Sequence, residues 1–384
     1  MKRIGAAARG LIRGRKHTAL LAAILLTTLA ASGGLLYYRS LGARVRRDDG
    51  YYFPAQVSPE EPPGEGYVLP ATDLDGVDEA LLKQSLRAWA QAENVPAPED
   101  RSVLNILLCG VDSRTGDARG GRSDAVMLVS VNRRRRTVVL TSFLRDSCST
   151  IDLIKDPSNP RVEFGRLAGA YSLGGPATLM ETLATDYKIR IDDFVCVDIN
   201  SFPKLIDALG GVTLDVSRAE AGYINRTVPG VKGKFPWGDG VELTGEQALL
   251  YSRVSQYDED RAGRQREVIL AILERARHAS PGQIVKALGK TLRYVYTDLT
   301  EDEVDALAKD ALTQGWLNYE ITQLRTPVLP GEAGQATGLS ADVNGQRVWI
   351  VDYAREAKRV QEAIYGFSTV EEGKGTDYVA GLFQ

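Results

Sequence analysis

The stretch that decides the fold spans residues 105–146 and reads NILLCGVDSRTGDARGGRSDAVMLVSVNRRRRTVVLTSFLRD. It holds short apolar or alternating runs rich in Val, Leu and Ile, which predict three β-strands at residues 103–111, 125–131 and 137–144. If successive strands run in opposite directions, the end of the first, the start of the second and the end of the third share one edge. Asp112, Asp124 and Arg145 stand at those positions. Two carboxylates and a guanidinium at one sheet edge indicate a site for a metal ion and an anion, most simply a phosphate.

Downstream of this stretch, strands and helices alternate. Residues 191–199 and 212–216 have the pattern of buried strands, and between them a short helix at 202–209 is stopped by Gly210 and Gly211. Pro176 stands where a helix would begin, after a predicted loop at 147–163. This alternation predicts an α/β fold, a three-layer α/β/α sandwich around a central mixed β-sheet. Further helices are expected at 77–92, 244–251 and 352–365, and further strands at 319–325 and 347–351.

The N-terminal part has a different composition. Residues 1–16 carry six Lys or Arg and no acid, and residues 19–36 form an almost uncharged apolar run. We expect a cytoplasmic basic tail at 1–18, a transmembrane helix at 19–38 that acts as a signal anchor, and an extracellular Pro-rich linker at 39–74. An extracellular domain would then occupy 75–384, with its motifs within 103–278 and a C-terminal extension at 279–384. A cleaved signal peptide ending near Ala31 is the alternative.

The composition excludes several classes of protein. The chain has 384 residues, 43% of them hydrophobic and 25% charged, which is typical of a globular protein. A net charge of −3 argues against nucleic-acid binding. Three cysteines without a CxxC pair indicate neither a disulfide framework nor a zinc ribbon, and His17 and His278 are the only histidines. Neither a P-loop nor a GxGxxG after a strand is present, so a nucleotide site is not expected.

A second group of cations follows at residues 253–266. Arg261, Gln265, Ile269 and Ile272 are spaced as on one face of a helix, so the first two extend the stripe that faces the core. Donors at the N-terminal end of such a helix can bind an anion. The alternative is a salt-bridged helix start in which the arginines pair with the acids at 258–260.

Two other features have simpler interpretations. Arg133, Arg134, Arg135 and Arg136 lie at the far end of the hairpin and are expected to form a solvated turn. The sequence AYSLG at 170–174 resembles a degenerate nucleophile elbow. A serine hydrolase would then need His278 as its base, at the end of a helix whose other end carries the arginines.

These motifs together resemble the LytR-CpsA-Psr family of bacterial cell-envelope assembly. The matching segments occur in family order: NILLCGVDSR at 105–114, GRSDAVM at 121–127, FLRD at 143–146, residues 166–176, FPKLIDALGGV at 202–212, LTGEQALLY at 243–251 and residues 261–266. The resemblance implies an enzyme that moves a glycopolymer, such as teichoic acid or capsule, from a polyprenyl pyrophosphate carrier to a peptidoglycan sugar hydroxyl as a phosphodiester. It also implies an apolar tunnel for the lipid tail, the usual presence of Mg²⁺, and a membrane anchor.

The resemblance also implies roles for individual residues. Asp112 and Asp124 look like the carboxylates that hold Mg²⁺ or accept the proton of the acceptor hydroxyl, and with Arg145 they form the expected catalytic set. The expected pyrophosphate grip comprises Arg114, Arg122, Arg145, Arg166, Arg253, Arg261, Arg264 and Gln265. The chain departs from the family pattern at Leu144, where Pro is frequent, and at Ser255, where many members have a second Arg that Arg264 would here replace.

Two other functions stay open from the sequence. The first is a non-catalytic polyprenyl-phosphate binding or regulatory protein of the envelope, in which the same arginines bind but nothing reacts. The second is a pyrophosphatase that releases the glycan phosphate without an acceptor. Charge neutralisation by arginines and a divalent metal suits displacement at phosphorus and needs no histidine.

Overall fold

The three predicted strands form the centre of the fold. A computed structural model describes residues 46–47, 73–74, 76–92, 97–113, 118, 121–152, 162–228, 231, 235–253, 258–278, 295–343, 345–371 and 377–383. The strands are β2 (Val103–Asp112), β3 (Arg122–Asn132) and β4 (Thr137–Phe143), each antiparallel to the next. The predicted antiparallel arrangement is confirmed, and it brings Asp112, Asp124 and Arg145 to one edge of the sheet.

The central sheet is mixed, as expected. It has the strand order β1-β10-β7-β2-β3-β4-β11. The outer strands are β1 (Arg46–Arg47), β10 (Val295–Thr297), β7 (Asp193–Asp198) and β11 (Glu320–Thr326). β7 runs parallel to β2 and β11 runs parallel to β4, so both end at the edge that carries Asp112 and Arg145.

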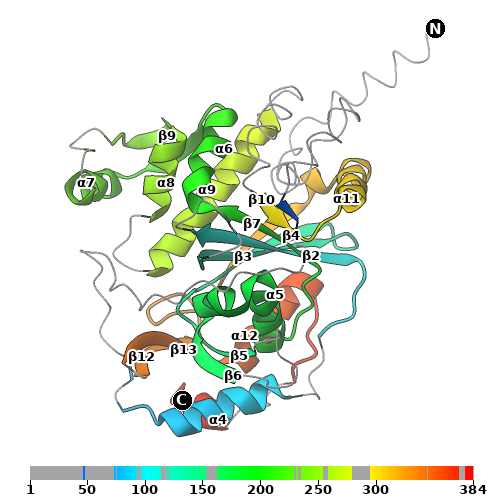
Figure 1. The fold of residues 1–384 in the computed structure, drawn as a ribbon, viewed down its shortest axis with the longest axis vertical. Helices are drawn as coiled ribbons and strands as arrows, with labels where there is room; N and C mark the ends of the chain where they lie inside the picture. Colours follow the sequence, from blue (N-terminus) through cyan, green and yellow to red (C-terminus); the bar gives the residue numbers. More distant parts are fainter. Residues whose placement is uncertain are drawn as a thin grey trace.

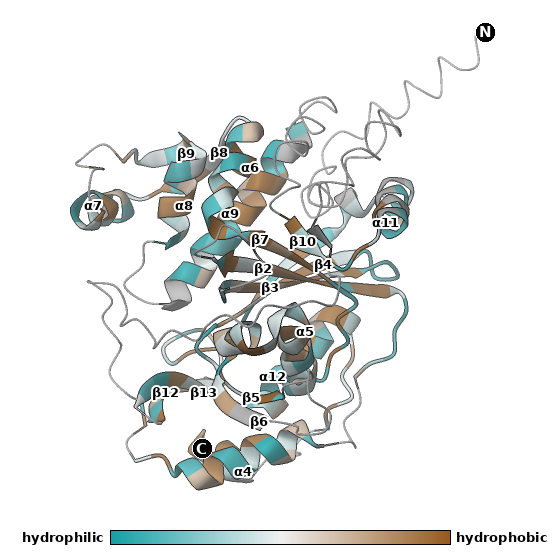
Figure 2. Ribbon diagram, viewed as in Figure 1, coloured by the Kyte–Doolittle hydropathy of each residue, from teal (hydrophilic) through white to brown (hydrophobic). Residues whose placement is uncertain are grey.

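Helices cover both faces of this sheet (Figure 1). One face packs against α6 (Phe202–Ala208), α8 (Gly245–Arg253) and α9 (Asp258–His278), and the other against α5 (Leu167–Tyr187) and α12 (Tyr353–Tyr365). Because side chains alternate between the faces, Val129 and Leu140 enter the core on the α9 side while Leu128 and Val139 enter the core on the α5 side. The central strands are accordingly the most hydrophobic part of the ribbon (Figure 2).

Smaller elements surround these layers. They are α4 (Glu79–Ala90), β5 (Cys148–Asp152), β6 (Val162–Arg166), η1 (Ile199–Ser201), β8 (Val212–Val216), α7 (Arg218–Thr227), β9 (Gly238–Leu243), α11 (Glu301–Gln314), η3 (Trp316–Asn318), β12 (Gly338–Val343), β13 (Gln346–Val351) and α13 (Asp377–Leu382). The predicted helix at 77–92 is confirmed as α4, with Leu82, Leu86 and Trp89 buried. All three cysteines are buried and unpaired.

The sequence prediction missed elements in two regions beside the site. The predicted loop at 147–163 contains β5 and the start of β6, which pair as a small separate sheet. The helix predicted to begin at Pro176 is confirmed as the second part of α5, because Gly175, with φ +74°, is not helical and divides α5 there. The first part, which begins at Leu167, was not predicted. Much of α5 is buried on several sides, so its sequence has no clear amphipathic period to reveal its first turns.

The predicted linker is attached to the domain at two points. Arg46–Arg47 adds a short strand to β10, and the Asp73 carboxylate accepts hydrogen bonds from the backbone N–H and hydroxyl of Ser340, at 2.8 and 2.9 Å. No helix within the described ranges combines the length and hydrophobicity needed to cross a membrane. The span predicted at 19–38 lies outside those ranges.

The arginine turn between β3 and β4 is anchored rather than merely solvated. Arg133 lies over the Trp316 ring at 5.0 Å, and Arg136 over the Tyr319 ring at 5.3 Å. Arg134 pairs with Asp100 at 2.5 Å. These contacts lie at the end of the hairpin opposite to Asp112 and Asp124, so the turn serves the fold and not the site.

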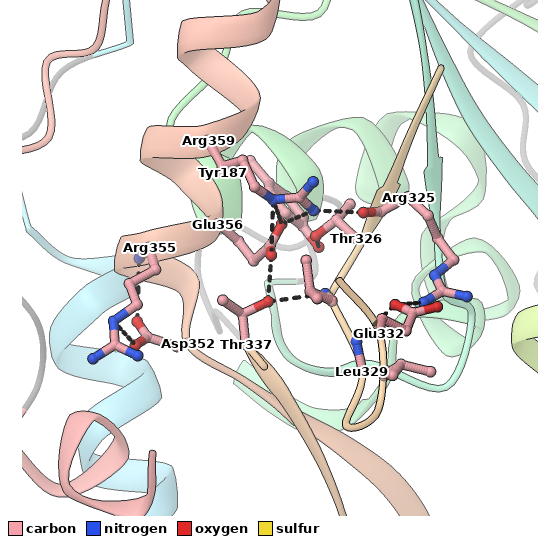
Figure 3. Close-up of polar contacts among 11 residues, drawn as sticks. Tyr187, Arg325, Thr326, Leu329, Glu332, Thr337, Asp352, Arg355, Glu356 and Arg359 are labelled. Atoms are coloured by element: carbon pink, nitrogen blue, oxygen red, sulfur yellow. Dashed lines mark hydrogen bonds and ion pairs between the residues drawn. The ribbon is translucent and has the colours of Figure 1, made fainter. Parts of the chain in front are cut away.

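A buried ionic network joins α12 to the end of β11 (Figure 3). The Glu356 carboxylate is fully buried; it pairs with Arg359 at 2.7 Å and accepts a hydrogen bond from Thr337. Arg359 also donates to the Arg325 carbonyl, and Thr326 donates to Tyr187 at 3.1 Å. The network fixes the end of β11 next to β4, the strand that precedes Arg145.

Replacing Glu356 by Gln is expected to lower the free energy of unfolding by about 2–3 kcal/mol. The Arg359 guanidinium would lose its charged partner while it stays largely covered, and an uncompensated charge of this kind is costly. Urea unfolding measures the change. Glu362→Gln, on the exposed face of the same helix, is the matched control and should change stability by less than about 0.5 kcal/mol. Equal stabilities of the two variants would contradict the role of the network.

Candidate functional site

Three strand ends form the first half of the site. Arg145, two residues after the end of β4, donates from Nη1 to the Asp124 carboxylate at 2.7 Å. Asp112, the last residue of β2, lies in register with Arg122, two residues before Asp124. The sheet edge therefore brings two acids and two arginines together from segments that are adjacent in space because the strands are antiparallel.

The second half comes from the helical layer above. Arg261, in the first turn of α9, reaches the other oxygen of Asp124 at 3.5 Å. Arg253, the last residue of α8, lies 3.9 Å from the Asp112 carboxylate. The two banks of charge predicted from the sequence thus face each other, with the carboxylates between them.

The Asp124 carboxylate remains ionised although it is buried. Its side chain is 8% exposed, and burial alone would raise its pKa. The charges of Arg145, Arg261 and Arg122 together outweigh burial and lower that pKa. Because both carboxylate oxygens are bound by guanidinium groups, Asp124 is suited to holding the arginines in place.

Asp146 is a site residue that the predicted set did not include. Its carboxylate lies 3.6 Å from Arg145 Nε and 3.3 Å from Arg166 Nε. Arg166 also donates to the Arg347 carbonyl at 2.9 and 3.1 Å. Asp146 therefore links Arg166 to the central pair, and its only sequence signal is its position next to Arg145.

Other predicted grip residues are placed differently. Arg264 points to the α7 side, where it pairs with Glu220 at 3.1 Å and lies over the Tyr251 ring at 5.7 Å. The structure does not bring it to the two aspartates. Arg114 and Ser255 lie outside the described residues.

A cavity of about 130 Å³ opens between the sheet and the helices α6, α8 and α9. Its body is apolar; the residues contributed by α9 are Val268, Ile269, Ile272 and Leu273, and Met127 and Val195 belong to the sheet wall. Arg253, Arg261 and Gln265 also line it, and they lie at the end next to Asp112 and Asp124. Along α9 the lining runs from Arg261 to Leu273, about 18 Å at the rise of an α-helix. The cavity is therefore cationic at one end and apolar along the rest.

Arg261 retains a donor for a ligand at that cationic end. Its Nε is buried and has no hydrogen-bond partner within the described residues. Buried guanidinium donors are normally satisfied, because an unpaired one costs free energy. An anion at the cavity end would satisfy it.

The loop after β2 is fastened to the start of α5. Tyr171 donates a hydrogen bond to the Ala118 carbonyl, and Ser172 donates to the Gly121 carbonyl at 3.1 Å. Gly121 has φ +120°, and a Cβ there would lie 2.3 Å from the Asp112 carbonyl oxygen. Only glycine fits this close approach, which brings the residue before β3 against the backbone of Asp112 at the end of β2.

The serine hydrolase interpretation is wrong. Ser172 binds the loop carbonyl of Gly121, as described above. His278 is at the other end of α9 from Arg261, where its Nε2 lies 2.9 Å from a Glu274 carboxylate oxygen. The two residues do not form a nucleophile–base pair.

The acids at the site fit a divalent metal only in part. Asp112 is 44% exposed and its single ion pair in the described part of the chain is the loose contact to Arg253, so its carboxylate is accessible. Both oxygens of Asp124 are already engaged. Among the described residues no group of three or more His, Cys, Asp or Glu side chains could hold a metal by itself. Mg²⁺ is commonly held by one or two carboxylates together with substrate phosphates, and the donors present here fit that arrangement, with Asp112 as the accessible ligand.

The geometry suits displacement at phosphorus. Arg253 and Arg261 line the end of the cavity at which a phosphate would bind, and the accessible carboxylate of Asp112 lies beside Arg253. The apolar part of the cavity extends from this end. Such chemistry needs positioning and charge neutralisation more than a covalent nucleophile.

The chain resembles known proteins in sequence. The model of the LytR_cpsA_psr family matches residues 78–363, nearly three quarters of the chain. Two curated relatives carry the name polyisoprenyl-teichoic acid–peptidoglycan teichoic acid transferase TagU. The one from Halalkalibacterium halodurans is 30% identical over 209 residues, which are 52% of this chain and 62% of that protein. The one from Oceanobacillus iheyensis is 32% identical over 220 residues, 54% of this chain and 63% of that protein.

The fold is also that of a solved structure. The LytR-CPS2A-psr family protein YwtF (TagT) with bound octaprenyl pyrophosphate lipid superposes with a TM-score of 0.51. It is 21% identical, and the match covers 73% of this chain and 99% of that one. The chain spans about three fifths of the length of the curated relatives it matches.

Proposed function

Because this chain belongs to the LytR-CpsA-Psr family, we propose that it transfers a glycopolymer from a polyprenyl pyrophosphate carrier to a peptidoglycan sugar hydroxyl, as a phosphodiester. The observation that carries the proposal is the cavity, with arginines at one end and apolar residues along α9. A polyprenyl pyrophosphate has the matching halves, an anionic head and an apolar tail. The names of the relatives and the lipid bound to the solved neighbour support the same substrate class.

The proposed reaction is a displacement at the phosphorus that carries the glycan. The acceptor hydroxyl oxygen forms a new bond to this phosphorus, and the bond from the phosphorus to the bridging oxygen breaks. Polyprenyl phosphate leaves with the bridging oxygen, and the glycan is left joined to the acceptor through a phosphodiester. Arg145 and Arg261 neutralise the charge that grows on the phosphate oxygens, held in position by Asp124.

Asp112 is the residue that we assign to the acceptor. Its accessible carboxylate can receive the proton of the attacking hydroxyl, whereas the Asp124 oxygens are bound by arginines. Mg²⁺, when bound to Asp112 and the substrate phosphates, and to Asp124 if Arg261 releases it, would supply further charge neutralisation.

We also propose the cellular setting expected from the sequence. The apolar run at 19–38 would anchor the chain in the cell membrane with the N-terminus in the cytoplasm and the domain outside. The lipid bilayer, the lipid-linked glycan and peptidoglycan are then its partners.

A reconstituted transfer assay tests the proposed function. The full chain in lipid nanodiscs is incubated with a polyprenyl pyrophosphate-linked glycan, Mg²⁺ and peptidoglycan fragments, and the products are identified by mass spectrometry. A phosphodiester-linked glycan together with polyprenyl phosphate supports transfer. Binding of the carrier without release of polyprenyl phosphate would instead show a regulatory binding protein. Release of free glycan phosphate when no acceptor is present would show a pyrophosphatase.

Removing divalent metal is expected to lower the transfer rate about 100-fold or more, because charge stabilisation by the ion would be lost. The assay is run after EDTA treatment, and Mg²⁺ is then added back as the control for irreversible damage. Binding of polyprenyl pyrophosphate, measured in parallel, should persist through the arginines. A transfer rate unchanged by EDTA would contradict the proposed role of Mg²⁺, and the arginines alone would then neutralise the charge on the phosphate oxygens.

A further inference from the structure

A further cation on α9 points away from the lipid cavity. Arg266 follows Gln265, yet only Gln265 lines the cavity. Two nitrogens of its guanidinium, Nε and Nη1, are buried and have no hydrogen-bond partner within the described part of the chain. Burial lowers its pKa and the charge of Arg325 lowers it further, although Glu267 and Glu332 oppose the effect. A cation in this setting destabilises the free protein unless a ligand completes its contacts.

Arg325 lies opposite, on the last strand of the sheet. In the parallel pairing of β11 with β4 it is in register with Ser142, and parallel partners point to the same face. Ser142 lies on the same face of β4 as Val138 and Leu140, which belong to the core on the α9 side. Arg325 therefore also points toward α9. Its side chain is 14% exposed and its Nε lacks a hydrogen-bond partner within the described residues.

One carboxylate pairs directly with Arg325. Glu332 forms an ion pair with Arg325 and also accepts a hydrogen bond from the Leu329 N–H at 3.0 Å (Figure 3). It holds Arg325 in place but leaves Arg266 without a hydrogen bond to its buried Nε and Nη1. The two guanidinium groups therefore have donors to spare for a second anion.

The arginine pair lies on the far side of the reacting centre from the lipid. Thr326 pairs with Phe143, and Phe143 pairs with Val126, so Arg325 is at the same sheet edge as Asp124. β11 is two strands from β3, which corresponds to roughly 10 Å. The lipid cavity extends in the other direction, over β2 and β7. A donor molecule would place its tail in the cavity and its phosphates at Arg145 and Arg261, beside Asp124. Its glycan, or the acceptor that it meets, would then lie toward Arg266 and Arg325.

We propose that Arg266 and Arg325 form a second anion-binding subsite that takes a carboxylate or phosphate group carried by a sugar close to the reacting phosphorus. The inference rests on the proposed function, and it deepens it: the transferred glycan or the acceptor strand is anionic within about one or two sugar units of the bond that forms. Either source has the same chemistry, and the experiment separates them.

The test uses two donor analogues that differ in one charge. Each is a farnesyl pyrophosphate-linked disaccharide with a carboxylate on the second sugar, either free or as the methyl ester. Binding to the full chain is measured by titration calorimetry. The wild-type protein should bind the free acid about tenfold more tightly, since one charge-assisted hydrogen bond is worth this much. In Arg266→Gln the ratio should fall toward one. Arg275→Gln, whose parent side chain lies further along α9 and donates to the Leu209 and Gly210 carbonyls, should keep it.

The acceptor arm uses peptidoglycan fragments with free or amidated carboxylates. If the anion belongs to the acceptor, the donor ratio is one in every protein and Arg266→Gln instead raises the KM for the free-acid fragment about tenfold. If Arg266→Gln changes neither the donor ratio nor the KM for the acceptor fragment, the proposed subsite is overturned. Wild-type protein that binds neither donor analogue overturns the proposed function, and the subsite with it.

A stability measurement distinguishes a binding role from a structural one. Arg266→Gln removes a buried and unsatisfied charge, so its thermal midpoint should equal or exceed that of the wild type. A midpoint lowered by several degrees would show that Arg266 supports the fold, and would overturn the subsite.

Discussion

Replacing Arg145 by Ala is expected to lower the rate of glycan transfer about a thousandfold, while the protein stays folded. An arginine that neutralises charge at a transferred phosphorus typically contributes this much or more. Arg145 pairs with both Asp124 and Asp146, which hold its guanidinium at the edge of the sheet. Product formation with saturating donor, followed by mass spectrometry, measures the loss.

Two further variants make the Arg145 result specific. Arg145→Lys keeps the charge but not the planar fork, so it should recover only part of the rate. Arg134→Ala removes an exposed arginine from the far end of the hairpin and should transfer at the wild-type rate. A folded Arg145→Ala protein with full activity would place the reacting phosphorus elsewhere.

The second large effect concerns the dependence of stability on pH. Asp186 is fully buried, and burial raises its pKa to about 7, although Ser149, Tyr353 and Lys188 lower it in part. The folded protein therefore keeps this proton between pH 4 and 7 while the unfolded chain loses it. Stability contributed by the group is fully present below pH 4 and is lost as the pH rises to about 7. The loss for a shift of this size is on the order of 4 kcal/mol.

Asp186→Asn should remove this loss, because the amide is neutral at every pH. We expect the variant to be more stable than the wild type by several kcal/mol at pH 8 and to gain little at pH 4, as measured by urea unfolding at both values. Asp193, whose pKa is also raised to about 7 by burial and by the charges of Asp298, Asp192 and Glu303, keeps a slope of the same sign in the variant. Asp239→Asn, at an exposed position of β9, should follow the wild-type curve. Equal stability of Asp186→Asn and wild type at pH 8 would contradict the assignment.

The sequence was sufficient for the parts of the site that follow from local periodicity. β2, β3 and β4 are short apolar runs with clear boundaries, and antiparallel pairing alone brings Asp124 to Arg145. The helical spacing of Arg261 and Gln265 likewise indicated a core-facing position, and both line the cavity.

Features that depend on packing between distant segments could not be predicted. Arg264 has the same charge as Arg261 and lies three residues away, yet Glu220 on α7 draws it to the other side of the helix. The link from Asp146 to Arg166 depends on the pairing of β5 with β6, which places Arg166 opposite Cys148, two residues after Asp146, and the sequence did not reveal this small sheet. The first turns of α5 were missed because a helix buried on several sides has no amphipathic pattern.

In the proposed topology, the short strand β1 limits the distance between the domain and the membrane. Its backbone adds Arg46–Arg47 to the sheet beside β10, two strands from the start of the cavity wall at β7. Between the proposed membrane span, which ends at residue 38, and this strand there are eight steps of chain, which reach at most about 28 Å. A free linker as far as residue 74 would reach several times further. The strand therefore holds the domain close to the membrane. A carrier lipid could then enter the cavity without its tail leaving the bilayer completely.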